Sequence, residues 1–141
     1  MADLARQGRA ITRRHPWLPD AIRRPSVIGP NGLKYIDRFL GLLAGSGLDI
    51  AAKMEFIAMM NGFALMYGGM EATLAAQQAS TGVSPDQHAA AQVATLISAA
   101  ASGQYPNLAA ALTASPPSRE RDADEVFDSC VRRLIDGALP G

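Results

Sequence analysis

The polar residues that are best suited to catalysis or ligand binding lie in and beside one apolar stretch. Residues 54–70 read MEFIAMMNGFALMYGGM and contain Asn61 and Tyr67, and Glu71 follows directly. On the wall of an apolar cavity, an amide, a phenol and a carboxylate could orient a substrate and transfer a proton, with Glu71 as acid or base. The same side chains could instead be satisfied inside a core or on a solvated edge, because buried polar groups need hydrogen-bond partners. The spacing leaves both interpretations open.

Other residues that often carry chemistry are scarce and scattered. His15 and His88 are the two histidines and Cys130 is the single cysteine, so no metal-ligand spacing appears. The chain has no phosphate-binding loop and no dinucleotide fingerprint. We therefore expect no metal, no cofactor and no catalytic residue other than Glu71, should the domain be an enzyme. Cys130 falls on an apolar stripe and is expected to be an inert core thiol.

The apolar stretch itself predicts a central helix. Two overlapping stripes at helical spacing cover most of its circumference, which is typical of a helix with neighbours on several sides. The stripes are Phe56, Met59, Phe63, Met66 and Met70, and Phe56, Met60, Phe63, Tyr67, Met70 and Leu74. The uncharged run 56–70 is shorter than the roughly 20 residues of a membrane helix, so we expect no membrane span. Glycines at 62, 68 and 69 indicate a kink or the close approach of a neighbouring helix.

Around this helix the chain predicts an all-α fold of six to seven helices in a single domain covering residues 1–141. Alanine is abundant and no segment alternates with a period of two. We expect helices over 2–15, 17–24, from Pro30 to the GSG at 45–47, and over 48–80, 84–102, 107–113 and 122–138. Ser84, Pro85 and Gln87 form a helix-start signature. In the first helix we expect Leu4 and Ile11 inward and Arg9 outward.

Charge and composition narrow the class of protein. Residues 1–53 hold nine Arg or Lys against four Asp or Glu, and the remainder holds four against nine. The net charge of zero gives no reason to expect nucleic-acid binding by the chain as a whole. A lone cysteine and an N-terminus without an apolar stretch favour a cytoplasmic location.

Two segments carry a resemblance to a known family. HPWLPDAIRRPSVIGPNGLKYIDRFLGLLAGSGLD (15–49) resembles the effector-binding region of the tetracycline-repressor (TetR/AcrR) transcriptional regulators, and DEVFDSCVRRLIDGALPG (124–141) resembles their usual ending. In the second segment the matching positions are Phe127, Leu134, Ile135, Asp136 and Gly137. The resemblance covers residues 2–139.

The resemblance implies a hydrophobic small molecule as ligand and a homodimer held by a four-helix bundle. The residues expected to line the ligand cavity are Trp17, Tyr35, Phe39, Phe56, Met60, Asn61, Phe63, Tyr67, Met70 and Glu71. The residues expected at the dimer interface are Val93, Leu96, Ile97, Ala100, Phe127, Cys130, Val131 and Leu134.

The chain also departs from the pattern of the family it resembles. Members of the family begin with a three-helix DNA-binding head, and here the chain starts at the connecting helix, so we expect no direct DNA binding by this chain. The leading hypothesis is the drug- or effector-binding domain of such a regulator. The alternative is a headless relative that acts as an enzyme on a bound metabolite.

Overall fold

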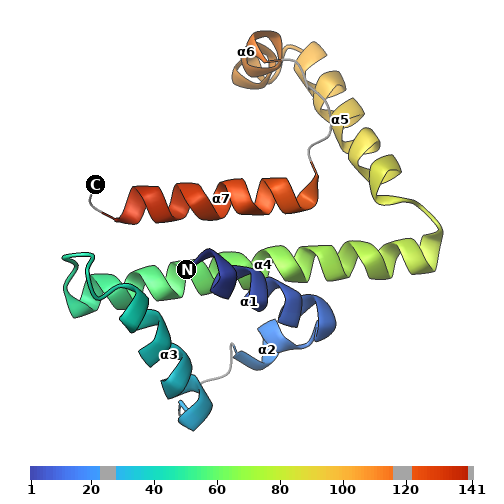
Figure 1. The fold of residues 1–141 in the computed structure, drawn as a ribbon. Helices are drawn as coiled ribbons and strands as arrows, with labels where there is room; N and C mark the ends of the chain where they lie inside the picture. Colours follow the sequence, from blue (N-terminus) through green and yellow to red (C-terminus); the bar gives the residue numbers. More distant parts are fainter. Residues whose placement is uncertain (23–27, 116–121, 140–141) are drawn as a thin grey trace. The chain divides into compact units, whose positions relative to one another are not determined.

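The computed structural model describes residues 1–22, 28–115 and 122–139, and in these ranges the regular structure is all helical. The helices are α1 (Ala2–Arg14), α2 (Leu18–Ile22), α3 (Pro30–Leu42), α4 (Ile50–Thr81), α5 (Pro85–Ala101), α6 (Pro106–Ala114) and α7 (Ala123–Ala138) (Figure 1). The all-α prediction is confirmed. Arg23 and Arg24, expected at the end of a helix over 17–24, lie outside the described residues. No helix in the described ranges is long and apolar enough to cross a membrane.

Local sequence signals account for most of the helix ends. α4 ends before Gly82, whose φ of +72° is a backbone conformation that favours glycine. The predicted start of α5 is confirmed as a capping box. The Ser84 amide donates to Gln87 Oε1 at 2.9 Å, and the Gln87 amide donates to Ser84 Oγ at 3.2 Å. These caps fix the bounds of the two helices at this point of the chain.

The chain packs as two compact units, Met1–Thr73 with Asp122–Gly141 and Leu74–Arg121. The first unit holds the hydrophobic core, and in it α7 runs antiparallel to α4 (Figure 1), with Phe127 stacked on Phe63 at a centroid distance of 5.4 Å. In the second unit α5 packs on α6, and neither helix has a buried residue. The expectation of one domain over residues 1–141 stays a prediction.

α1 lies against α4 through small residues. A Cβ added to Gly68 would lie 2.7 Å from the Arg9 carbonyl oxygen and 3.0 Å from Thr12 Cβ, so the two helices meet without a side chain between them. A Cβ at Gly8 would meet Ala64 Cβ at 3.4 Å. Close approach of a neighbouring helix, one of the two reasons expected for these glycines, is therefore confirmed at Gly68.

The orientation of α1 corrects two expectations. Arg9 and Thr12 are buried, whereas Ile11 is about half exposed at 49%. The face that meets α4 holds Ala5, Gly8, Arg9 and Thr12, at the i, i+3, i+4 and i+7 spacing of one helical face. Ile11 lies off that face, so the prediction of Ile11 inward and Arg9 outward is wrong.

Candidate functional site

Arg9 links three helices through one buried guanidinium. Its Nε donates to Glu71 Oε2 on α4 at 2.8 Å, and its Nη2 donates to the other carboxylate oxygen of Glu71. The same Nη2 lies 2.8 Å from Asp124 Oδ1 in the first turn of α7. The hydrogen bonds to Glu71 raise the pKa of Arg9 above an already high value, so the group is a permanent cation. One side chain on α1 therefore ties α4 and α7 together.

Two aromatic rings enclose this cation. The Arg9 guanidinium carbon lies 4.7 Å from the centroid of Phe127 and 5.2 Å from that of Tyr67, within the range of cation–π contacts. The Tyr67 hydroxyl donates to the Ala123 carbonyl oxygen at 3.1 Å. Burial raises the pKa of Tyr67, which keeps the phenol neutral as a donor. Tyr67 and Glu71 thus belong to a network that joins helices.

Asn61 is satisfied by a second polar contact in the same unit. The Tyr35 hydroxyl of α3 donates to Asn61 Oδ1 of α4, and burial raises the pKa of Tyr35. No buried side-chain nitrogen or oxygen is left without a hydrogen bond among the residues that the structure describes. The interpretation of Asn61 as a residue satisfied inside the fold is the one that this contact matches.

The ten side chains expected to line a cavity fall into four groups, of which the hydrogen-bonded pair Tyr35 and Asn61 is the first. Phe39, Phe56 and Met60 fill the core of the first unit, where Phe39 makes edge contacts with Tyr35 and Phe56 at centroid distances of 5.9 and 6.1 Å. Phe63, Tyr67 and Glu71 surround Arg9 or its aromatic partner Phe127. Trp17 and Met70 lie at the surface, at 62% and 52% exposure. Contact of these residues with a ligand stays a prediction.

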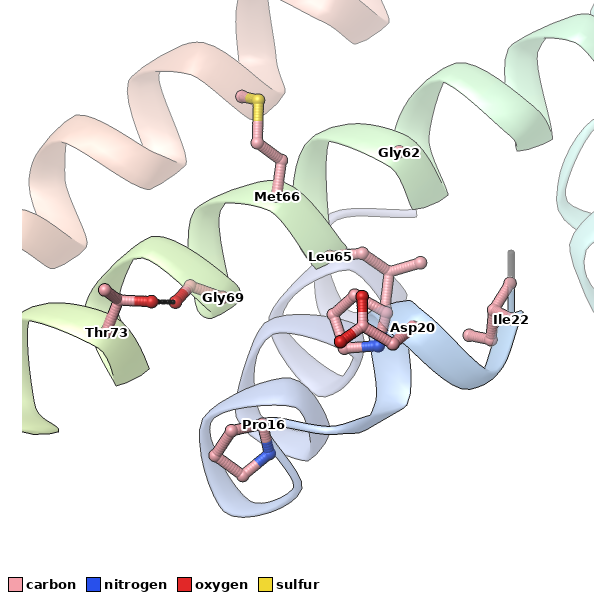
Figure 2. A pocket seen from close by; sticks show the side chains of 9 residues that line it. Pro16, Asp20, Ile22, Gly62, Leu65, Met66, Gly69 and Thr73 are labelled. Carbon is pink, nitrogen blue, oxygen red and sulfur yellow. Dashed lines mark hydrogen bonds between the residues drawn. The ribbon is translucent and has the colours of Figure 1, made fainter. Parts of the chain in front are cut away.

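One hollow of the first unit lies on another side of α4, against the α1–α2 turn and α2. It has a volume of about 490 Å³. Its lining residues are Pro16, Pro19, Asp20, Ile22, Gly62, Leu65, Met66, Gly69 and Thr73 (Figure 2). We call this hollow the α2–α4 groove. On the α4 wall the side chain of Thr73 donates to the Gly69 carbonyl oxygen at 2.9 Å. The lining combines apolar side chains with polar groups.

Two smaller hollows in the same unit differ in chemistry. One of about 370 Å³ is lined by Leu48, Ala52, Glu55, Phe56, Met59 and Ala138. The other, of about 260 Å³, lies between α1 and α7 and is lined mainly by charged residues that already form ion pairs with one another or with Glu71. In the described ranges, no three His, Cys, Asp or Glu side chains gather to hold a metal ion. Of these three hollows of the first unit, the α2–α4 groove has the largest volume.

The residues expected at a dimer interface also differ in how exposed they are. Phe127 and Val131 are fully buried in the core of their own unit, so these two offer no free surface to a partner. Leu96 and Ile97 on α5 are about half exposed. Val93, Ala100, Cys130 and Leu134 are intermediate. The dimer interface stays a prediction, and its α7 contribution is reduced to Cys130 and Leu134.

Sequence reasoning missed Arg9 and the prolines of the groove. An arginine on an amphipathic helix ordinarily faces solvent. The partners of Arg9 lie on helices that are distant in sequence, so no local spacing indicates the ion pair. For the groove, Pro16 and Pro19 flank Trp17, a residue that was expected at the site. The position of these prolines on either side of Trp17 was the signal in the sequence that could have indicated the groove.

Comparisons with known proteins agree with the helical architecture. Residues 1–139 match the family model described as Tetracyclin repressor-like, C-terminal domain. The chain is also 30% identical over 136 residues to the HTH-type transcriptional repressor DrrR1 of Streptomyces coeruleorubidus. That alignment covers 95% of this chain and 48% of the relative, so the chain spans about half the length of the curated protein it matches.

Proposed function

This chain belongs to the tetracycline repressor-like C-terminal domain family, and we propose that it binds a mostly apolar small molecule in the α2–α4 groove. The observation that carries the proposal is the groove itself, a hollow of about 490 Å³ with walls of proline, leucine, isoleucine and methionine. Ligand pockets are typically concave and mostly apolar, with a few polar groups that orient the ligand. Among the described residues of this lining, Asp20 and Thr73 carry the polar side chains.

The groove replaces the aromatic cavity expected from the sequence as the proposed ligand site. Phe39, Phe56 and Met60 are among the most buried residues of the unit, and displacing them would cost core packing. A ligand in the α2–α4 groove contacts α4 without disturbing that core. Trp17, the single tryptophan of the chain, follows the lining residue Pro16 in the sequence.

Trp17 makes this proposal testable without a label. We expect an uncharged apolar ligand to change the tryptophan fluorescence and to raise the midpoint of thermal unfolding, because it binds the folded state. Leu65→Gln, on the groove wall, should weaken binding roughly tenfold through lost apolar contact. Met54→Gln is the matched control, since Met54 lies on the same helix, is partly exposed and does not line the groove. Equal affinities for the two variants would remove the groove as the binding site.

The proposal extends to a homodimer. Two exposed apolar surfaces support it, Leu96 and Ile97 on α5 and Met66 and Met70 on α4. α5 and α6 have no buried residue, and a helix pair without a core of its own needs a covering surface. Light scattering measures the molar mass of the double variants Leu96→Arg/Ile97→Arg and Met66→Arg/Met70→Arg. The pair of substitutions that converts the dimer to a monomer identifies the interface. A dimer that survives both pairs of substitutions would exclude both surfaces.

We propose that, in a longer protein that contains this domain, the bound ligand alters transcriptional repression. The relative named above is a repressor, and this chain corresponds to about half of it. An effector acts by favouring one of two conformations to which it binds with different affinity. A reporter assay of the longer protein, with wild-type and Leu65→Gln domains, tests this step. A response to ligand that is the same in both would contradict it.

A further inference from the structure

The outward face of α7 carries two charges that have no partner within the described chain. The inward face of this helix holds Phe127 and Val131, which are buried, and two aspartates that bind arginines of α1. Glu125 and Arg133 are exposed, and among the described residues neither forms an ion pair. Packing within the first unit therefore leaves these two charges available to another molecule.

Glu125, Ser129 and Arg133 form one row on this outward face. They follow one another at intervals of four residues, which keeps them on the same side of the helix. The acid and the base are eight residues apart, or about 12 Å of helix, whereas charges on one helix pair when they lie three or four residues apart. The row therefore cannot neutralise itself, and a small residue, Ser129, lies at its midpoint.

We infer that this row recognises the same row on a second copy of the chain, with the two α7 helices antiparallel and crossing at Ser129. The inference rests on the homodimer proposed above. An isologous interface exchanges positions that are equally spaced from its two-fold axis, so an axis at Ser129 places Glu125 of each copy opposite Arg133 of the partner subunit. Rows of residues four apart are also the ridges through which helices commonly pack.

The order of the charges favours this arrangement over a parallel one. Parallel α7 helices in the same register would bring two glutamates together at one end of the row and two arginines together at the other, and like charges in contact cost free energy. Exposed ion pairs add little affinity, so we expect apolar contacts elsewhere to supply most of the free energy of dimerisation. The charges of α7 then determine the orientation and the register of the two copies.

Charge reversal tests the pairing on the full chain. Glu125→Arg and Arg133→Glu each create two like-charge contacts across the axis, and each should raise the dimer dissociation constant about tenfold or more at low salt. The double variant Glu125→Arg/Arg133→Glu keeps the net charge of the wild type and restores opposite charges, so it should dimerise as the wild type does. An equimolar mixture of the two single variants should form a heterodimer for the same reason. Analytical ultracentrifugation measures all four samples.

Disulfide trapping tests the position of the axis. In a Cys130→Ser background, Ser129→Cys places one thiol of each copy at the axis and should give an oxidised dimer, since a disulfide needs Cα atoms within about 7 Å of each other. Asp136→Cys is the matched control, because Asp136 is exposed on the same helix and lies about two turns from the axis. It should remain a monomer on denaturing, non-reducing electrophoresis.

The outcomes separate this inference from the homodimer on which it rests. A wild-type chain that is monomeric overturns both. A wild-type dimer that both single reversals leave intact, a double variant that fails to recover, or equal trapping of the two cysteine variants overturns the α7 inference alone. A change in thermal unfolding of Glu125→Arg at unchanged molar mass also overturns it, because the row would then contact another part of the same chain.

Discussion

α4 presents two contrasting surfaces within two turns of Gly68. On the surface that receives α1, a Cβ at Gly68 would lie 2.7 Å from the Arg9 carbonyl oxygen, and Glu71 holds the Arg9 guanidinium. On the surface that lines the α2–α4 groove, among the described residues, a Cβ at Gly62 would have nothing within 4 Å and a Cβ at Gly69 would meet Pro19 Cγ at 3.9 Å. The first surface is closed by packing, and the second is a hollow of about 490 Å³.

The contrast shows that glycine serves two purposes in the same helix. At Gly68 it removes an obstacle between two backbones, so its contribution is to stability. At Gly62 no contact within the described chain needs its absent side chain, so its contribution is to the shape of the groove. Substitutions on the two surfaces should therefore separate folding from binding. The largest effects belong to the α1 surface, where a charge is buried and the backbones are closest.

Breaking the Arg9 network should give the largest loss of stability. Arg9→Met removes a cation that is 7% exposed and leaves the Glu71 carboxylate partly buried without its partner. Removing one member of such a pair typically costs about 3–5 kcal/mol. We expect a loss of this size in the free energy of unfolding, measured by urea denaturation of the full chain.

A double-mutant cycle separates the ion pair from the packing around it. If the Arg9–Glu71 interaction dominates, Arg9→Met/Glu71→Gln should lose less than the sum of the two single variants. The matched surface control is Arg13→Met, since Arg13 is mostly exposed and lies 3.8 Å from Glu71. Additive losses would mean that Arg9 stabilises the unit through its aromatic contacts with Tyr67 and Phe127.

Adding one methyl group on each surface should give opposite changes. Gly68→Ala should lower the free energy of unfolding by about 1–3 kcal/mol, because the Arg9 backbone must move to admit the Cβ. Gly62→Ala should raise it by about 0.5–1 kcal/mol, because alanine favours the helix and its Cβ meets nothing. Chemical denaturation of both variants with the wild type measures the difference. A destabilised Gly62→Ala protein would mean that the groove is closed at that position.

The helices could be predicted from the sequence because their signals are local. The Ser84–Gln87 capping box, Gly82 beyond the end of α4 and the acidic first turn of α7 all act within a few residues. The close approach at Gly68 was one of two predictions, because glycine within a helix indicates either a kink or a neighbouring helix that packs closely. The helix ends depend on the chain's own backbone and on contacts within about one turn, whereas the neighbour that Gly68 meets, α1, is far away in sequence.

The Arg9 network and the groove could not be predicted because they are contacts between helices far apart in sequence. Arg9 and Glu71 are separated by 62 positions, and a charged residue on α1 was assigned to solvent by its type alone. The position of α2 against α4 decides which side of α4 is hollow, and the methionine and phenylalanine stripes of α4 are similar on several sides. Composition therefore predicted the central helix, and the cavity wall expected on it stays a prediction.

The smallest expected effect is on an exposed ion pair, which provides the contrast to buried Arg9. Arg6 donates from Nε and Nη2 to the two oxygens of Asp128, both at 2.9 Å, and these hydrogen bonds hold the pKa of Asp128 below its usual value. A carboxyl with a lowered folded pKa stabilises the protein above its unfolded pKa of about 3.9, and this contribution disappears as the pH falls through the folded pKa. Asp128→Asn should therefore be slightly less stable than wild type near neutral pH, and the difference should shrink below about pH 4. Thermal unfolding from pH 7 to pH 3 measures it, and a difference that is constant with pH would show that the carboxyl contributes by packing alone.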